Sequence, residues 1–572
     1  MIGRVIGKRI VLGMVGSGLI GAALPAASEA PAAGSPAAER PSADSDHFDP
    51  FGKFFLPGNL VVSRTVYDNN PNNLAVGTIL PPGCESTTGG CSAASGAPFD
   101  GTYPLVWNND LYDASFGITS KILLDQVTPS GRLIGSLEVP NSLQRGIKGS
   151  SDQLVTSFSS KSELALNLSS DGRYLTFMGY VAPVNAIDAS NSNTSGAVDP
   201  TNPVGEAFAR AVAQVDEKGR FQFTETNAYS GNNGRAAVLE NSGGADVIFT
   251  AGNAGNGANP QPAGVVLGAG TQFIVPANAP ESAQSPGTPT PAASFSVTEL
   301  GAKADKLGKD DNYRGLTVFG NVLYYSKGSG SNGVNTVYFA DSTGKACPNG
   351  VGVPAAHAHL PTAPLAFDPA TLLTTGLPST MCVLAGFPST PNKSATVTAF
   401  PFGIWFADAH TVYIADEGDG YTGGTDLYTH AAAQTTAGLQ KWVFNSATGN
   451  WSLAYVLQTD LGLGVPYTVT GYPSGSNAAT GLPWSPAADG LRNITGRVGR
   501  DGKVTIWAIT STISGDGDTG ADPNRLVAVE DRLENTDSAV AAQERFHTLR
   551  TAKFGEALRG VSFTPGTSLD QR

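Results

Sequence analysis

Short apolar runs recur along most of this chain, and segments rich in glycine, asparagine, aspartate and serine separate them. The runs "RYLTFMGYV" (173–181), "NVLYYSKGS" (321–329) and "VTIWAITS" (504–511) have the length and the aromatic and β-branched content of β-strands. No long stretch keeps the period of an amphipathic helix. The pattern therefore predicts an all-β protein built from many short strands.

The strands recur as a four-stranded unit. Each unit opens with a segment of the type Arg-Gly-apolar-Ser/Thr, such as "YRGLTVFG" (313–320), and a second strand, a polar loop and two further strands follow. The units begin near Ala165, Arg235, Arg314, Gly403 and Asn493. Intervals of roughly 70 to 90 residues exceed a short propeller repeat, and we expect the excess in the loop between the second and third strands. Repeated four-stranded units are typical of a β-propeller.

The two ends of the chain together make one more unit. "RGVSFTP" (559–565) is an opening strand with no unit after it, and "GNLVVSRTVYD" (58–68) resembles a second strand with no opener. We expect the C-terminal strand to pair with the N-terminal blade, because closure hides the sheet edges that otherwise invite aggregation. The prediction is a propeller of six blades; seven is the alternative, since 264–300 is rich in Pro, Ala and Ser.

The N-terminal 30 residues have the three parts of a secretory signal: a basic start, an apolar run over 10–24 and small residues over 26–30. The apolar run is short for a transmembrane helix. The predicted organisation is a signal peptide over 1–30, a disordered Ala/Pro/Ser linker over 31–50, one propeller domain over 51–566 and a tail over 567–572. We therefore expect a secreted or periplasmic protein with no membrane insertion after signal cleavage.

Cysteine content and charge fit that compartment. An even number of cysteines in an exported chain favours disulfides, and the economical pairing is Cys84–Cys91 with Cys347–Cys382, although three connectivities are possible. No CxxC spacing supports a cysteine metal site. The net charge of −13 argues against nucleic acid and anionic membranes as partners. We expect a monomer.

Acidic loops are the main candidate site. Loops that join equivalent strands of a propeller emerge on one face, and two of the predicted loops are rich in carboxylates, which are ligands that Ca²⁺ prefers. The candidate ligands are Asp416, Glu417, Asp419, Asp516, Asp518 and Asp522. "DGDTGADPN" (516–524) lacks the glutamate at position 12 of an EF-hand. The alternative is that Asp and Gly serve only as turn residues.

Histidines and opener arginines are further candidates. His357 and His359 have an HxH spacing that could hold a transition metal, although a solvated pair is the commoner case. His410 and His430 flank the Asp416 loop, where a histidine beside carboxylates could act as a general base. Similar opener positions are occupied by Arg235, Arg314, Arg492 and Arg559. These arginines could line the channel and bind an anion, or each could pair with a carboxylate of a neighbouring blade.

The openers "PGNLVVSR", "YRGLTVF", "TVYIADEG" and "RGVSF", in this order, resemble a group of exported bacterial β-propeller proteins of unsettled activity. The resemblance covers 58–565 and rests on structural motifs. More distantly, the chain resembles six-bladed propeller hydrolases of the phytase-like and gluconolactonase-like classes, and that resemblance implies Ca²⁺-dependent chemistry. No nucleophile elbow, P-loop or Rossmann motif is present.

These observations predict a protein that binds a small molecule, a glycan or an extracellular protein through the loop-rich face of its channel. The alternative is a Ca²⁺-dependent hydrolase of the esterase, lactonase or phosphatase type. In that hydrolase, a metal ion would polarise the substrate oxygen and activate water. Its ligands would be Asp416, Asp419, Asp516 and Asp518.

Overall fold

A computed structural model describes residues 52–68, 70–77, 117–147, 154–194, 204–243, 246–253, 270–276, 312–328, 334–362, 381–391, 395, 398–477, 481–515 and 520–568. All of them belong to one compact unit, 48–572. The predicted signal peptide and linker lie outside the described residues.

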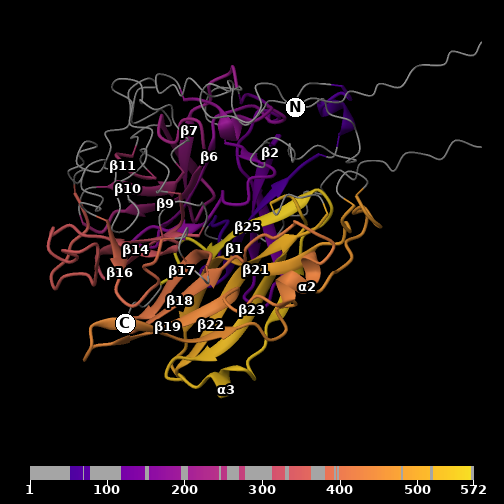
Figure 1. Ribbon diagram of the computed structural model, residues 1–572. Coiled ribbons are helices and arrows are strands. Elements are labelled where there is room, and N and C mark those ends of the chain that lie inside the picture. Colours follow the sequence, from indigo (N-terminus) through magenta and orange to yellow (C-terminus); the bar gives the residue numbers. More distant parts are fainter. Residues whose placement is uncertain are drawn as a thin grey trace, which may run out of the picture. The chain divides into compact units, whose positions relative to one another are not determined.

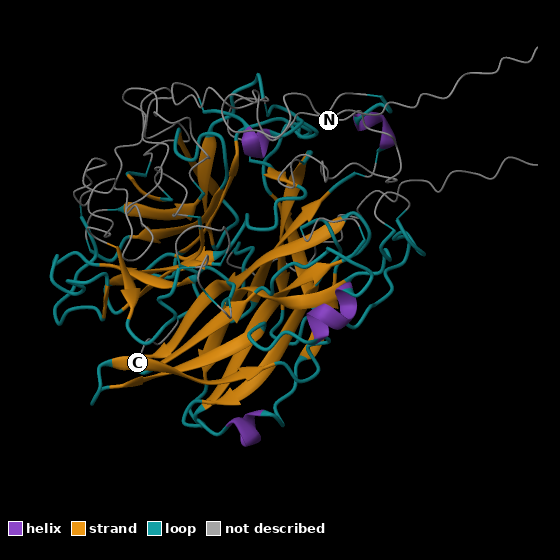
Figure 2. Ribbon diagram, viewed as in Figure 1, coloured by secondary structure: helices purple, strands orange, loops and turns teal. Residues whose placement is uncertain are grey.

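The described residues form six β-sheets (Figures 1 and 2). Blade 1 contains β25 (Glu556–Phe563), β1 (Leu60–Val66), β2 (Thr119–Val127) and β3 (Leu133–Glu138), with β4 (Thr156–Ser157) beside β2. Blade 2 contains β5 (Asn167–Leu168), β6 (Tyr174–Tyr180), β7 (Arg210–Asp216) and β8 (Phe221–Thr226). Blade 3 contains β9 (Gly234–Glu240), β10 (Val247–Gly252) and β11 (Thr271–Ile274).

Blade 4 contains β12 (Tyr313–Phe319), β13 (Val322–Lys327), β14 (Thr336–Ala340), β16 (Met381–Leu384) and β15 (Val351–Gly352). Blade 5 contains β17 (Pro401–Asp408), β18 (Thr411–Asp416), β19 (Gly438–Asn445) and β20 (Asn450–Leu457). Blade 6 contains β21 (Ala487–Val498), β22 (Lys503–Ile513), β23 (Arg525–Arg532) and β24 (His547–Thr551). Two short α-helices, α2 (Leu427–Ala432) and α3 (Ser538–Ala541), lie between strands, and the single-turn helices η1 (Pro71–Asn73) and η3 (Ala189–Asn191) lie in loops.

The sheets are arranged as a six-bladed β-propeller, which confirms the predicted fold. The first strand of each blade contacts the first strand of the next, in the cyclic order β5, β9, β12, β17, β21, β25 and back to β5. The inner strands therefore surround a central channel. The described strands make six blades, and the alternative of seven is not supported.

The last strand closes the ring as predicted. β25 pairs antiparallel with β1, from Leu60 opposite Phe563 to Val66 opposite Glu556. Arg64 of β1 supports this pairing, because its guanidinium binds Asp125 of β2 at 2.8 and 3.1 Å and Glu556 of β25 at 2.7 Å. Arg550 also contacts Asp125, at 2.8 Å. The first and last strands are thus joined by backbone and by charge.

The glycine of the Arg-Gly opener has a structural cause. A Cβ on Gly560 would collide with the backbone carbonyl of Leu164 in blade 2, and a Cβ on Gly315 with that of Phe402 in blade 5. At the first junction, Ser63 Oγ donates to the Leu164 carbonyl at 2.8 Å and accepts from Gly560 N at 2.8 Å. In blade 4, Ser326 makes the same two bonds: its Oγ donates to the Phe402 carbonyl and accepts from Gly315 N. Glycine at this position lets adjacent blades approach backbone to backbone.

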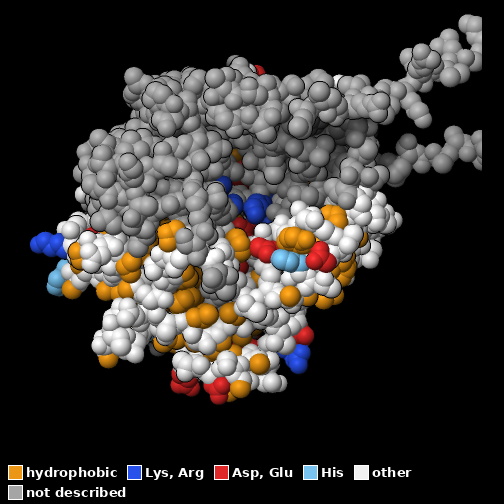
Figure 3. Space-filling model, in the orientation of Figure 1, with side chains coloured by type: hydrophobic (Ala, Val, Ile, Leu, Met, Phe, Trp, Pro, Cys, Tyr) orange, Lys and Arg blue, Asp and Glu red, His pale blue; other side chains and the backbone are white. Residues whose placement is uncertain are grey.

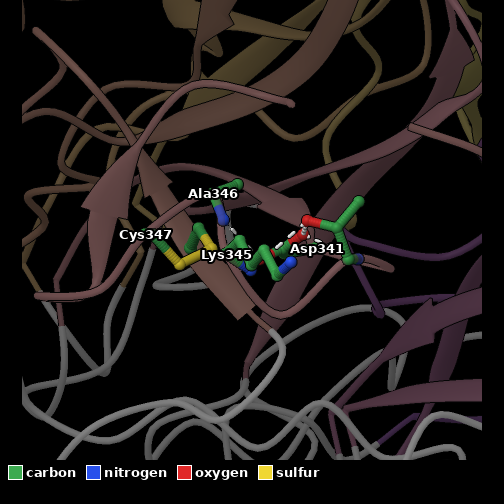
Figure 4. The surroundings of a disulfide bond; sticks show 6 residues. Asp341, Lys345, Ala346 and Cys347 are labelled. Carbon is green, nitrogen blue, oxygen red and sulfur yellow. Dashed lines mark hydrogen bonds between the residues drawn. A yellow bond between two sulfur atoms is a disulfide. The ribbon is translucent and has the colours of Figure 1, made fainter. Parts of the chain in front are cut away.

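Blade 4 departs from the predicted loop lengths. The prediction put the extra residues between the second and third strands, but β13 and β14 are close in sequence and the long insertion follows β14. The predicted Cys347–Cys382 disulfide ties this insertion to β16 (Figure 4). Asp341 organises the turn before Cys347, because its carboxylate accepts from the backbone N–H of Ala346 at 2.8 Å. Cys84 and Cys91 lie outside the described residues, as do any contacts they make.

Apolar side chains fill the space between neighbouring blades. At the junction of blades 4 and 5, the rings of Tyr324 and Phe406 pack at a tilt with centroids 4.5 Å apart, and Trp442 and Trp451 belong to the same cluster. Burial of such large side chains is the main favourable term for a fold of this kind. In the part of the chain that the structure describes, no helix is long and apolar enough to cross a membrane.

Candidate functional site

Six equivalent residues meet at one end of the channel, one from the opening segment of each blade. Their equivalence follows from the backbone, because at four of the six junctions the residue after an opener approaches the opener carbonyl of the next blade. Ala165 N donates to the Arg235 carbonyl at 3.3 Å, and Gly403 packs on the Arg492 carbonyl. The six openers are Leu164, Arg235, Arg314, Phe402, Arg492 and Arg559. We call this end of the channel the mouth.

Glu417 is at the centre of the charged contacts in the mouth. It directly follows β18 of blade 5, the blade whose own opener is Phe402 rather than arginine. Its carboxylate lies 3.3 Å from Arg492 Nε, 3.7 Å from Arg314 Nη2 and 3.4 Å from Lys161 Nζ. Blades 4 and 6 and the segment before blade 2 therefore meet on one carboxylate. For Arg314 and Arg492, the predicted pairing with a neighbouring blade's carboxylate is confirmed.

The other two opener arginines also join neighbouring segments. Arg235 donates to the Tyr313 carbonyl at 2.9 Å and to the side chain of Asn312, both from blade 4. Arg559 donates to the Phe158 carbonyl, in the segment that leads into blade 2. These bonds hold the guanidinium groups in place at the mouth.

Electrostatic effects in the mouth are strong because the groups are buried. Burial alone would raise the pKa of Glu417, but Lys161, Arg314 and Arg492 outweigh burial and lower it to about 2. Burial, together with Arg314 and Arg492, lowers the pKa of Lys161 to about 8, against the opposing attraction of Glu417. Burial also lowers the pKa of Arg235, and the positive charge of Arg314 adds to this effect. The mouth is thus a region where positive charges are crowded together.

Lys161 is the accessible member of this group. Its side chain keeps 31% of its surface exposed, whereas Arg314 and Arg492 keep 5% and 4%. Figure 3 shows Lys and Arg side chains in a hollow near the centre of the view. Gly520 packs against the backbone of Ser159 and Lys161, so the end of the loop that precedes β23 runs beside the lysine. Lys161 is therefore the most solvent-accessible of the three side chains that contact Glu417.

Two further carboxylates lie close to Glu417. Asp416 is buried and accepts from Phe400 N at 2.8 Å, Gly418 N at 3.0 Å and Gln440 Nε2 at 3.1 Å. Burial raises its pKa to about 7, and Glu417 adds to the shift. The second carboxylate is that of Asp489, and burial raises its pKa to about 6. Near neutral pH, Asp416 and Asp489 therefore carry less negative charge than ordinary carboxylates would.

The remaining acidic candidates are distributed around the loops. The Asp419 carboxylate accepts from His430 Nε2 at 2.6 Å, and the His430 ring stacks on Tyr421. Asp522 accepts from Ser514 Oγ at 2.9 Å and from the hydroxyl of Tyr472. Asp516 and Asp518 lie outside the described residues.

The structure describes four of the six predicted calcium ligands and does not bring these four into one cluster. Among the described residues, the group of three metal-ligand side chains with ligand atoms within 4.8 Å of one another is Asp341 with Cys347 and Cys382, and its two cysteines form the disulfide. Glu417 is engaged with three cations, which compete with Ca²⁺ for its oxygens. Calcium binding by the loop that contains Asp516 and Asp518 stays a prediction.

The histidine candidates lie at the surface. His357 and His359 are exposed, and His357 has a positive φ of 69°. His410 is also exposed. Only His430 lies beside a carboxylate of the Asp416 loop, as the sequence suggested. Lys161 was not predicted from the sequence, although "SSKSEL" (159–164) places a lysine just before the second unit.

Comparisons with known proteins give no family. No protein-family model and no curated protein matches the chain. A polysaccharide lyase of family PL25, an ulvan lyase bound to -[GlcA(1-4)Rha3S]-, is 11% identical with a TM-score of 0.29, over 78% of this chain and 90% of that one. Drosophila semaphorin 1a, extracellular domains 1–2, is 10% identical with a TM-score of 0.21, over 73% of this chain and 84% of that one. Scores this low support no argument about function.

Proposed function

We propose that the mouth of the channel binds a small anionic molecule, such as a carboxylic acid or an acidic saccharide. The observation that supports this proposal is the set of five cationic side chains at one end of the channel, three of which contact the carboxylate of Glu417. They are Lys161, Arg235, Arg314, Arg492 and Arg559. The sequence predicted a small molecule, a glycan or a protein as the ligand, and this proposal restricts the ligand to small molecules and saccharides that carry a negative charge.

The physical argument is one of local field against net charge. The chain carries a formal charge of −13, yet Lys161, Arg314 and Arg492 meet at this end of the channel, and the two arginines are almost fully buried. Low-dielectric walls focus the field of such a cluster, and arginine and lysine bind carboxylates through charge-assisted hydrogen bonds. Because Lys161 is the most exposed of the five, we expect it to contact the ligand directly.

A titration tests the proposal. Isothermal calorimetry with galacturonate, glucuronate and citrate should detect binding, whereas galactose and glucose, which lack the carboxylate, should bind at least tenfold more weakly. The variant Lys161→Met should weaken binding of the acids by at least tenfold. Lys53→Met is the matched control, because Lys53 is also 31% exposed and pairs with a glutamate, Glu217, at 2.8 Å. Equal binding of acids and neutral sugars, or equal loss in both variants, would overturn the proposal.

A further inference from the structure

The junction of blades 5 and 6 contains a buried lysine in contact with a buried aspartate. The side chains of Lys441 in β19 and Asp531 in β23 are both 0% exposed, and Nζ of the lysine lies 3.1 Å from Oδ2 of the aspartate. We propose that these two side chains condense to an amide, so that an isopeptide bond joins blade 5 to blade 6. This inference is independent of the anion site at the mouth of the channel.

The surroundings of the pair favour its uncharged form. Two charges that leave water lose their hydration, and their attraction offsets this loss only in part. Nζ of Lys441 lies among aromatic rings, 5.7 Å from the ring centre of Tyr413 and 5.4 Å from that of Tyr455. Burial lowers the pKa of Lys441 and outweighs the opposing attraction of Asp531. The neutral amine, which can act as a nucleophile, is therefore easier to form here than at the surface.

Hydrogen bonds hold the amine against the carboxyl group. Nζ donates to the carbonyls of Arg532 and Asn535, at 2.7 and 2.8 Å. Arg532 is the last residue of β23, so both acceptors belong to the end of the strand that carries Asp531 and to the turn after it. Two groups held together in this way react as in an intramolecular step. After condensation, the nitrogen keeps one hydrogen for one of these carbonyls.

The neighbours of Asp531 prepare its carboxyl carbon for attack. Tyr455 donates its hydroxyl to Oδ1 at 2.8 Å, and the hydroxyl of Tyr413 donates to Oδ2. Such donors stabilise the negative charge that develops on oxygen when a nucleophile attacks the carbon. Glu544, between α3 and β24, also hydrogen-bonds to Asp531, and burial and the Asp531 charge raise the pKa of Glu544. Two carboxyl groups form this bond only when one carries a proton, so Glu544 can transfer protons at the reacting atoms.

The reaction is a condensation that releases one water. The Lys441 ammonium gives one proton to the Asp531 carboxylate, and the lone pair of the neutral nitrogen attacks Cγ to form a C–N bond. Glu544 then protonates the hydroxyl on Cγ and takes a second proton from the nitrogen, so its own carboxyl group is regenerated. The C–O bond breaks and the oxygen leaves as water. The nitrogen has lost two hydrogens and the carboxyl group one oxygen, and no other reagent is needed.

Peptide mapping of the full-length protein tests the inference. Trypsin does not cleave after an acylated lysine, so the digest should contain a branched peptide in which residues 394–492 are joined to residues 526–532 with the loss of one water. Fragmentation should place the bond between Lys441 and Asp531. A digest of the folded protein that contains 394–441 and 442–492 as separate peptides, and no branched peptide, would overturn the inference.

An internal control and a variant test the assigned causes. Lys53 lies 2.8 Å from Glu217, but both side chains are 31% exposed, so this pair should stay unlinked in the same digest. Glu544→Gln keeps the size of the side chain and removes the acidic proton, and it should lower the yield of branched peptide at least tenfold. Linkage of the surface pair, or a wild-type yield in Glu544→Gln, would refute the roles given to burial and to Glu544. The wild-type digest decides whether the bond exists, whatever the stability of the variant.

Discussion

The Nε atom of Arg492 lies 3.3 Å from Oε2 of Glu417, across the junction of blades 5 and 6. Both side chains are almost completely buried. Removal of one partner of a buried ion pair leaves the other charge uncompensated, which costs more than the pair itself contributes. Glu417 pairs with three cationic side chains, so its loss should destabilise the contacts of blade 5 with both neighbouring blades and with the segment before blade 2.

Glu417→Gln should therefore lower the free energy of unfolding at pH 7 by about 3 to 5 kcal/mol. The low pKa of Glu417 means that the stabilisation is present above the ordinary value of 4.5 and is lost as the pH falls toward 2. Denaturant unfolding at pH 7 and pH 3 should show a large difference between wild type and variant at pH 7 and a smaller one at pH 3. Glu217→Gln, which removes a surface pair, should cost less than about 1 kcal/mol at both values.

Gly560→Ala should weaken the junction of blades 1 and 2. The added methyl group collides with the Leu164 carbonyl, and backbone must move to accommodate it. We expect a loss of about 1 to 3 kcal/mol in urea unfolding, the usual range for forced overpacking. Gly205→Ala is the control, since a Cβ there meets nothing within 4 Å. An equal effect of the two substitutions would contradict the assigned role of the opener glycine.

Asp125→Asn should destabilise the closure of the ring. Burial alone would raise the pKa of Asp125, but Arg64 and Arg550 hold it below its usual range. The carboxylate therefore stabilises the folded state above its unfolded pKa, and this contribution is lost as the pH falls through the folded value. The melting temperature of the variant should lie below that of wild type at pH 7 and approach it under acidic conditions. Curves that stay parallel from pH 7 to pH 3 would exclude this account.

Asp416→Asn should give the opposite pH dependence. The folded pKa of about 7 lies above the ordinary value of 3.8, so the folded protein retains a proton that the unfolded chain has released between these values. Wild-type stability relative to the variant should therefore fall as the pH rises from 4 to 7 and stay level above pH 7. Chemical denaturation at pH 4, 5.5, 7 and 8 measures this, and a wild-type advantage that grows with pH would refute it.

The predicted calcium site makes a separate prediction. If the loop that contains Asp516 and Asp518 binds Ca²⁺ together with Asp522, EDTA should lower the melting temperature and added Ca²⁺ should restore it, because a ligand that binds only the folded state stabilises it by mass action. Asp518→Asn should remove the response. Elemental analysis of the purified protein supplies the stoichiometry, and a metal-free protein whose melting temperature ignores both reagents would end the calcium proposal.

The sequence allowed the fold to be predicted in some detail because its repeats are periodic. Opening segments with an arginine recur at four of the six inner strands, and the unpaired strands at the two ends predicted the pairing of β25 with β1. The position of the insertion in blade 4 was wrong, because a loop held by Cys347–Cys382 can extend from any pair of strands.

The site was less predictable for a physical reason. Glu417 was chosen as a metal ligand because it lies in an acidic segment. Its charged partners Arg492, Lys161 and Arg314 come from outside blade 5 and are distant in sequence. Whether a carboxylate binds a metal ion or pairs with a lysine or arginine side chain depends on which blades are adjacent. The sequence of a single blade does not contain that information. The four opener arginines could be placed at the channel because they occupy equivalent positions in the repeated opening segments.

The closure of the ring also has a consequence for how the molecule is made. The partners Ser63 and Gly560 are 497 residues apart in the chain, so the first blade stays incomplete until synthesis is almost finished. At about 5 to 20 residues per second, the edge of β1 remains open for roughly 25 to 100 seconds. An open edge of this kind accepts any matching strand. Two nascent chains on one messenger RNA could therefore exchange their last strands and emerge as a domain-swapped dimer.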